Sequence, residues 1–209
     1  TMQALSRSLK DIGKPFRDAL LLCINNFNNQ GGAHNLKIRL ISLDDQYNPT
    51  KTRSYVQQLL HDYKTDILLG AQGTPTLSSY LDLIKEKKVF SIFPWTGAFH
   101  DLNLPYLLKL RASYFDVGYT VTKFVIEQKG ARKIALFYQN DQFGKGNLAG
   151  GLKALQDAGI EDYLTVPYEA HEPNLMDQAE KIKQYKPDAV GLFSVPFSSE
   201  KLLNNFDLN

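Results

Sequence analysis

The sequence predicts an α/β fold of three layers, α/β/α, in which mainly parallel sheets lie between helices. Segments whose apolar residues repeat at helical spacing alternate along the chain with short apolar segments of strand length. The helical segments are about 10 to 15 residues long, which suits the crossover between two parallel strands. The alternation breaks between residues 105 and 118 and then restarts, so we expect two such units.

The first unit shows this alternation from its first helix onward. Pro15 suits a first helical turn, and Gly31 and Gly32 end the helix that it opens. The segment at 66–69 is short and apolar, which is typical of a strand in the buried middle of a parallel sheet. We expect helices at residues 15–29, 50–62 and 76–87, and strands at residues 36–43, 66–69, 89–93 and 107–110.

The second unit follows the same pattern but stops early. A strand normally precedes a first helix, yet only about a dozen residues do so here, and residues 204–209 have no clear pattern. Two doubly wound units of ~100–150 residues each would be longer than this chain, so we expect it to be incomplete at both ends. We expect helices at residues 116–128, 145–158 and 174–185 and one starting near Ser198, and strands at residues 133–138, 163–168 and 189–193.

Composition and charge exclude several classes of protein. Of the 209 residues, 43% are hydrophobic and 22% are charged, as in ordinary globular proteins. The net charge is only +2 and both signs are interspersed, so neither a nucleic acid nor an anionic membrane surface is indicated as a partner. The single cysteine, Cys23, excludes an internal disulfide and a cysteine-built zinc site, and its apolar neighbours predict a buried thiol.

Two loops that follow predicted strands carry residues suited to a small ligand. In open α/β sheets, ligands bind beside the carboxyl ends of the strands. The loop at 70–76 offers the hydroxyls of Thr74 and Thr76 beside two glycines that allow close approach, although an ordinary helix cap explains the same residues. The loop at 94–98 contains the only tryptophan, Trp95, which either stacks on a ligand or packs beneath the loop.

Signatures of enzymes and cofactors are weak. The glycines at 144, 146 and 150 resemble the dinucleotide-binding pattern, but the last interval is one residue too long and the motif starts several residues after its strand. Glu169 near a later strand end would then be the acid that binds ribose. The chain has no nucleophile elbow, and its histidines are scattered. We therefore expect neither an enzyme nor a bound cofactor or metal.

Several segments, in their order along the chain, resemble one family. The stretch from Leu5 to Gly13 resembles the first ligand loop of that family, except that Arg7 stands where the family usually has glycine. The other matching segments are 24–32, 43–49, 70–76, 93–98, 110–114, 137–144 and 186–190. Together they resemble the type I periplasmic solute-binding proteins, specifically the branched-chain amino acid (Leu/Ile/Val-type) receptors of ABC transporters.

The resemblance implies a fold and a division of the chain. The implied fold has two Rossmann-like lobes that close around a cleft by a hinge motion when ligand binds. Residues 1–117 would form the N-terminal lobe, without its first strand. Residues 118–209 would form part of the second lobe. The resemblance also implies a periplasmic or extracellular location.

The resemblance also implies ligand-binding residues. Thr74 and Thr76 match the hydroxyl residues that bind the carboxylate of an amino acid, and Gly73 precedes them. The Trp95, Thr96 and Gly97 loop matches the one that offers a carbonyl and an amide to the ligand. In the second lobe, Phe143 and Phe197 match aromatic positions, and Tyr114 lies where the chain crosses between lobes.

Three functions remain open at this point. The first is an extracytoplasmic solute-binding protein that captures a small polar ligand, an amino acid or related carboxylate, and delivers it to an ABC permease. The second is the same module as the sensing ectodomain of a membrane receptor. The third is a nucleotide-dependent α/β enzyme. Bulky Trp95 and Phe143 favour a pocket with substantial apolar contact over a purely hydrophilic sugar site.

Overall fold

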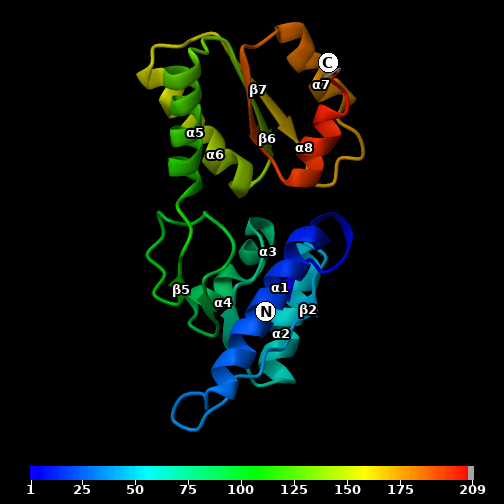
Figure 1. Cartoon of the computed structure of the whole chain (residues 1–209), viewed down its shortest axis with the longest axis vertical. Helices are drawn as coiled ribbons and strands as arrows, with labels where there is room; N and C mark the ends of the chain where they lie inside the picture. The colour runs from blue at the N-terminus through cyan, green and yellow to red at the C-terminus, as the bar shows by residue number, and fades with distance from the viewer. Residues whose placement is uncertain (207–209) are drawn as a thin grey trace. The chain divides into compact units, whose positions relative to one another are not determined.

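The computed structural model describes residues 1–206 of the chain. It divides into two compact units (Figure 1). Unit 1 consists of residues 1–96 and 101–111, and unit 2 consists of residues 97–100 and the chain from residue 112 onward. The boundary predicted between residues 117 and 118 falls inside helix α5 (Tyr114–Lys129), which lies in unit 2.

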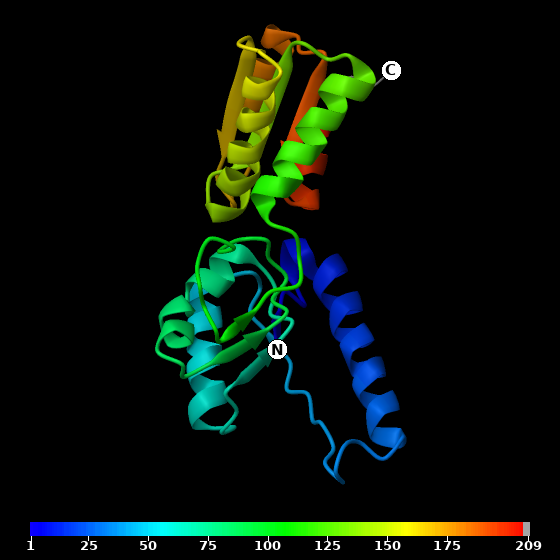
Figure 2. The same ribbon diagram turned by 90° about the vertical axis from the view of Figure 1, so that its left-hand side faces the viewer.

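Unit 1 contains two small parallel sheets with helices around them (Figure 2). In one sheet β1 (Met2–Gln3) pairs with β2 (Leu43–Asp44), and in the other β4 (Phe90–Ile92) lies between β3 (Ile67–Leu69) and β5 (Leu107–Leu108). Every one of these pairings is parallel, as predicted. The helical segments are η1 (Arg7–Leu9), α1 (Lys10–Asn29), α2 (Pro49–His61), α3 (Thr74–Ser78) and α4 (Leu81–Lys85).

Two helix predictions in unit 1 need correction. Helix α1 starts at Lys10, so Pro15 lies inside the helix rather than in its first turn. The helix predicted at 76–87 is two short helices, α3 and α4, interrupted at Ser79 and Tyr80. The Ser79 hydroxyl donates to the carbonyl of Thr76 (2.7 Å), and such local bonds from serine compete with the helical hydrogen bonds.

Two strand predictions in unit 1 were also wrong. Of the strand predicted at 36–43, only Leu43 pairs within a sheet; the amide and carbonyl groups of Ile38 bond instead to the side chain of Asn28. Strand β3, predicted to lie in the middle of its sheet, lies at the edge, and its Ile67 is 53% exposed. The middle position belongs to β4, because β4 alone of the three has a neighbour on each side.

The prediction that Cys23 is buried was wrong as well. Its thiol group is exposed, and Leu22 beside it is 72% exposed. Only Gly13 and Ile24 are buried in the twenty residues of α1. The apolar stripe of this helix is therefore largely uncovered.

A buried carboxyl group organises the loop after β2. Asp45 is fully buried; one of its oxygens accepts the amide of Tyr47 (3.0 Å) and the other accepts the hydroxyl of Thr52 (2.9 Å). Burial raises the pKa of Asp45 to about 6, and the neighbouring charge of Asp44 adds to this. Asp45 thereby ties the loop to the start of α2.

Unit 2 is a regular three-layer arrangement (Figure 1). Its strands are all parallel, with β6 (Ile134–Gln139) between β7 (Tyr163–Tyr168) and β8 (Ala189–Phe193). Helices α5 and α6 (Gln142–Asp157) cover one face of this sheet, and α7 (Met176–Tyr185) and α8 (Pro196–Leu203) cover the other. Every predicted element of this unit is therefore present, with boundaries shifted by a few residues.

The central strand β6 is buried on both faces, and its side chains alternate between two cores. Ala135 and Phe137 pack with residues of α7 and α8. Ile134 and Leu136 pack with residues of α5 and α6. This alternation is the reason that a continuous apolar run in the sequence forms a strand here rather than a helix.

Helices α5 and α6 approach each other through glycines. A Cβ atom on Gly118 of α5 would lie 1.9 Å from the carbonyl oxygen of Asn147. A Cβ atom on Gly150 of α6 would lie equally close, 1.9 Å, to the carbonyl oxygen of Phe115. Because both obstacles are helix backbone, neither can move without separating the helices.

Across residues 1–206, no helix has the length and apolar character required to cross a membrane.

Replacing Gly118 with alanine should destabilise unit 2. Alanine improves helix propensity by up to about 1 kcal/mol, but the collision with Asn147 should cost about 1–3 kcal/mol, the usual range for an overpacked core. We expect a net loss of about 1–2 kcal/mol in urea unfolding. Thr120→Ala, at an exposed position on the same helix, is the control and should be nearly neutral. A more stable Gly118→Ala protein would show that the helices separate easily.

The buried Asp45 should make stability fall as pH rises. Its pKa is raised from 3.8 to about 6, so the folded chain binds this proton more tightly than the unfolded chain does. Folding is then favoured below pH 4, and this advantage, up to about 3 kcal/mol, disappears between pH 4 and 6. Asp45→Asn should therefore match the parent near pH 4 and exceed its stability above pH 6 in unfolding experiments. An equal difference at both pH values would contradict the assignment.

Candidate functional site

The loops after β3 and β4 lie side by side at the carboxyl ends of their strands. We call residues 70–76 and 93–96 the loop pair. The amide of Trp95 donates to the carbonyl of Ala71 (2.8 Å), and the amide of Gly73 donates to the carbonyl of Trp95 (3.3 Å). The ladder between β3 and β4 thus continues into the loop pair and fixes one loop against the other.

Two buried glutamine side chains fasten β1 to the first of these loops. We call them the glutamine clasp. The Gln3 side chain donates to the carbonyl of Gly70 (2.5 Å), while the side-chain oxygen of Gln72 accepts the amide of Ala4 (3.0 Å). The amide of Gln72 also donates to the carbonyl of Met2 (3.1 Å). Sequence reasoning missed both glutamines, since a glutamine in a sequence gives no sign of whether its side chain bonds to distant backbone.

Gly73 is placed in the loop pair by its backbone conformation. Its φ of +101° lies in the region that favours glycine. A Cβ atom here would lie 2.3 Å from the ring of Tyr47 and 2.8 Å from the hydroxyl of Thr76. The loop after β2 therefore packs closely on this glycine, and no other residue type fits without displacing Tyr47.

The hydroxyls of Thr74 and Thr96 meet across the loop pair. Their oxygens are 2.7 Å apart, and both residues are buried. Thr76, in contrast, uses its hydroxyl inside its own loop, where it donates to the carbonyls of Gln72 and Gly73. The structure thus brings Gly73, Thr74, Thr76 and Thr96 together as a cluster, with Thr76 supporting the loop.

Trp95 takes part in this cluster through its backbone and packs with its side chain. Its ring lies 5.0 Å from the ring of Phe16 on α1, at an interplanar angle of 44°. The guanidinium of Arg111 lies 5.8 Å from the centre of the indole ring, within the range of a cation–π interaction. The indole is half-buried. Its buried part packs beneath the loop, and its exposed part is accessible to a ligand, so both interpretations of the sequence remain open.

In unit 2, Gly97, Tyr114 and Phe143 lie together. The amide of Tyr114 donates to the carbonyl of Gly97 (3.0 Å), and a Cβ atom on Gly97 would lie 2.5 Å from the carbonyl oxygen of Ala112. The ring of Tyr114 meets the ring of Phe143 edge to face, with centroids 5.0 Å apart. Tyr114 is buried and Phe143 is half-buried.

Phe197 lies apart from these three residues, at the start of α8. It is 43% exposed, and the ammonium group of Lys201 lies 4.6 Å from the centre of its ring. Phe143 follows β6 and Phe197 follows β8, which are parallel neighbours, so both aromatics lie at the same end of the sheet. No contact between the two rings is observed among residues 1–206.

A polar network that sequence reasoning missed joins the strand ends of unit 2. The Tyr168 hydroxyl donates to the side-chain oxygen of Gln139 (3.0 Å), and the Gln139 amide donates to Asp141 (2.6 Å). Burial raises the pKa of Tyr168 to about 12, so this hydroxyl stays a donor at neutral pH. Asp141 also caps α6 by accepting the amides of Phe143 and Gly144. In the sequence, the only sign of this network is the helix cap, an aspartate placed just before a predicted helix.

The glycines that resemble a dinucleotide-binding motif serve helix packing. Gly144 and Gly150 lie inside α6, and a Cβ atom on either would collide with protein backbone at about 2 Å. Glu169 accepts the side-chain amide of Asn140 (2.7 Å). Within residues 1–206, no group of three or more histidine, cysteine, aspartate or glutamate side chains is placed to hold a metal ion.

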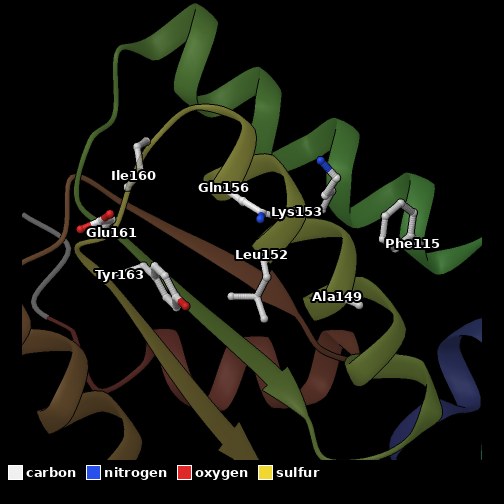
Figure 3. Close-up of a pocket in the computed structure, with 8 residues that line it drawn as sticks. All are labelled: Phe115, Ala149, Leu152, Lys153, Gln156, Ile160, Glu161 and Tyr163. Atoms are coloured by element: carbon white, nitrogen blue, oxygen red, sulfur yellow. The ribbon is translucent and has the colours of Figure 1, made fainter.

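An open groove of about 630 Å³ on unit 2 contains none of the predicted site residues. It runs along α6, with Phe115 near one end and Tyr163 near the other (Figure 3). Its charged and amide side chains are those of Lys153, Gln156 and Glu161, Tyr163 adds a hydroxyl, and Lys153 pairs with Asp157. They do not converge on one point in the groove, so we place the candidate site at the loop pair.

The chemistry available at the loop pair is that of binding. It supplies hydroxyls, backbone amides and carbonyls, and the indole ring of Trp95, which can position a small polar molecule.

Comparison with known proteins now assigns the chain to a family. A sequence profile described as periplasmic binding protein matches residues 3–207. A curated relative, the leucine-, isoleucine-, valine-, threonine-, and alanine-binding protein of Pseudomonas aeruginosa, is 23% identical over 147 residues. That match covers 69% of this chain but only 39% of the relative, so the matched segment spans well under half of that protein's length.

Solved structures share the fold. A fatty acid ABC transporter substrate-binding protein from Thermomonospora curvata superposes with a TM-score of 0.87 at 22% identity, over 97% of this chain and 52% of that one. A possible leucine/isoleucine/valine-binding protein from Rhodopirellula baltica SH 1 gives 0.88 at 23% identity, over 99% of this chain and 59% of that one. The predicted α/β class with parallel sheets is confirmed. On the profile match over nearly its whole length, the chain belongs to the periplasmic binding protein family.

Proposed function

We propose that this chain is the ligand-binding part of an extracytoplasmic solute-binding protein, and that its ligand is a small aliphatic carboxylate such as an amino acid. The observation that carries the proposal is the hydroxyl pair of Thr74 and Thr96 at the carboxyl ends of two neighbouring parallel strands. One hydroxyl of this pair donates to the other. Both O–H groups would turn toward a bound carboxylate, whose two oxygens accept several hydrogen bonds.

The named relatives support this ligand class. One is described as binding leucine, isoleucine, valine, threonine and alanine, and one solved structure as the substrate-binding protein of a fatty acid transporter. An amino acid and a fatty acid share a carboxylate and an aliphatic part. The loop pair offers hydroxyls for the carboxylate, and the indole of Trp95 offers an apolar surface for the aliphatic part.

Each predicted residue has a role in this proposal. Thr74 and Thr96 donate to the carboxylate, while Thr76 and Gly73 hold the loop that carries Thr74. Within unit 2, the half-buried Phe143 and the partly exposed Phe197 are apolar residues at the strand ends, and Tyr114, whose amide bonds to Gly97, packs on Phe143.

The proposed partner is an ABC permease, which would receive the ligand. The second candidate role, the sensing ectodomain of a membrane receptor, uses the same site. The complete gene distinguishes them. A membrane-spanning segment followed by a signalling domain in the same polypeptide identifies a sensor, and a neighbouring permease gene identifies a transporter.

Replacing Thr74 with valine should weaken ligand binding and leave the fold intact. The substitution removes the hydroxyl and keeps the branched shape; a hydrogen bond to a charged group contributes about 1.5–3 kcal/mol, so affinity should fall roughly 10- to 100-fold. The measurement is isothermal titration with leucine, other aliphatic amino acids and short fatty acids. Thr165→Val, in strand β7 of unit 2, is the matched control and should bind as the parent does.

Leucinamide, which lacks the carboxylate, completes this test. We expect it to bind at least about 10-fold more weakly than leucine, and to lose less affinity than leucine on Thr74→Val, since its neutral carbonyl accepts a weaker hydrogen bond than a carboxylate does. Equal affinity of leucine for the parent and for Thr74→Val would remove Thr74 from the site. Binding of nucleotides alone would overturn the proposed ligand class.

Trp95 should report binding by its fluorescence, because it is the only tryptophan. A saturating ligand at the loop pair should shift its emission, and a ligand at 100 times its dissociation constant should also stabilise the fold by about 2.7 kcal/mol. Trp95→Phe should keep the fold, since an aromatic ring still faces Phe16, but weaken binding. Stabilisation by ligand with no change in Trp95 emission would place the site elsewhere.

A further inference from the structure

The buried carboxyl group of Asp45 shares one hydroxyl with the start of α2. The Thr52 hydroxyl lies 2.9 Å from an oxygen of Asp45 and also 2.9 Å from the carbonyl oxygen of Asn48. A hydroxyl has only one proton, so Thr52 cannot donate to both acceptors at once. If Asp45 carries a proton, its own O–H donates to Thr52, and Thr52 donates to Asn48. The protonated acid therefore satisfies both contacts, whereas the ionised acid leaves one of them unmade.

Two other titratable groups act on Asp45. One is the carboxyl of Asp44 on the same loop, and the other is the phenol of Tyr80, which is fully buried between α3 and α4 in the chain. Burial acts to raise the pKa of Asp44, but the hydrogen bonds that it accepts, among them those from the amides of Leu5 and Gln46, hold it below its ordinary value. Burial raises the pKa of Tyr80 above its ordinary value. Neither group therefore changes its charge between pH 5 and pH 8.

The basic side chains near the start of α2 have other partners. Lys51 donates to the side chain of Gln46 (2.6 Å), and Arg53 pairs with Asp82 at 2.5 Å. Within residues 1–206, no cation forms an ion pair with Asp45. A buried carboxyl that has a carboxylate beside it and no cation favours its neutral form.

The loop that Asp45 holds is in direct contact with the loop pair. Asp45 accepts the amide of Tyr47 (3.0 Å), and the ring of Tyr47 packs so closely on Gly73 that no Cβ atom fits there. Gly73 precedes Thr74, whose hydroxyl lies 2.7 Å from that of Thr96. The φ of Tyr47 is +58°, a left-handed conformation that a bulky residue keeps only when its surroundings hold it. A change in the bonds of Asp45 thus reaches the hydroxyl pair through one side-chain contact.

We propose that Asp45 is a proton switch for the loop pair: the protonated acid holds the loop after β2 against Gly73, and loss of the proton releases this loop. When the proton leaves, Thr52 turns its hydroxyl to the carboxylate and gives up its hydroxyl bond to Asn48. Tyr47 then shifts relative to Gly73, and the hydroxyl pair loses its alignment. The consequence for ligand, tighter binding at acidic pH, rests on the proposed function, but the switch itself does not.

The test follows the carboxyl carbon of Asp45 and the amides of Gly73 and Thr74 by NMR between pH 4 and pH 8, without ligand. We expect all three signals to change together, with one midpoint near the pKa of about 6. In Asp45→Asn the side chain cannot ionise and keeps an N–H to donate to Thr52, so both amides should stay at their acid positions. Asp18→Asn, at an exposed position on α1, is the matched control and should keep the parent's midpoint.

A second variant separates the switch from a change of charge alone. Thr52→Val removes the shared hydroxyl and keeps the branched shape of the side chain. Asp45 should still titrate in this variant, but the amides of Gly73 and Thr74 should no longer follow it, because the shared hydroxyl that passes on the change is absent.

Ligand affinity gives an independent readout. Leucine should bind the parent at least about 5-fold more weakly at pH 7.5 than at pH 5, the lower end of the usual coupling between two sites. It should bind Asp45→Asn equally at both pH values, and this variant also controls for any titration of leucine itself.

Three results would overturn the switch. One is a pair of Gly73 and Thr74 amides that do not follow the titration of Asp45, and another is the same change of these amides in Asp45→Asn. The third is equal affinity of the parent for leucine at both pH values. If the amides follow Asp45 and yet no aliphatic carboxylate binds at either pH, the switch is supported and the proposed function fails.

Discussion

The strand-end surface of unit 1 depends on the glutamine clasp. Gln3 and Gln72 are both buried, and each exchanges hydrogen bonds with backbone on the opposite segment, so β1 is held to the loop after β3 by side chains as well as by its ladder. Buried amides of this kind are costly when unpaired. The clasp therefore fixes the position of Gly73, on which Tyr47 packs, and with it the position of Thr74 opposite Thr96.

The two units show where a sequence is sufficient to predict a fold. In unit 2 every expected helix and strand is present, because β6 has both neighbours and its apolar residues find cores on both faces. In unit 1 the apolar residues at 36–42 predict a strand equally well, yet only Leu43 and Asp44 pair. A strand requires a partner edge, and periodicity within one segment contains no information about that edge.

For the candidate site, the sequence was enough to identify the loops but not the role of each side chain in them. Position after a parallel strand was enough to select the loops at 70–76 and 94–98, and the structure joins them by hydrogen bonds between Trp95 and the first loop. The different uses of Thr74 and Thr76 could not be predicted, because they depend on which hydroxyl faces Thr96 and which faces its own backbone. Glutamine and tyrosine, which form the polar networks at the strand ends of both units, have no distinctive spacing to read.

The long reach of the glutamine clasp also has a kinetic consequence. The bond between Ala4 and Gln72 closes a loop of 68 residues, whereas α5, β6 and α6 of unit 2 are consecutive in the chain. Contacts between distant residues are entropically expensive to form early, and domains rich in them fold more slowly. Unit 2 should accordingly fold first. The surface around Thr74 would be among the last parts of the chain to acquire its native shape, during an interval in which the apolar edges of unit 1 are open to aggregation.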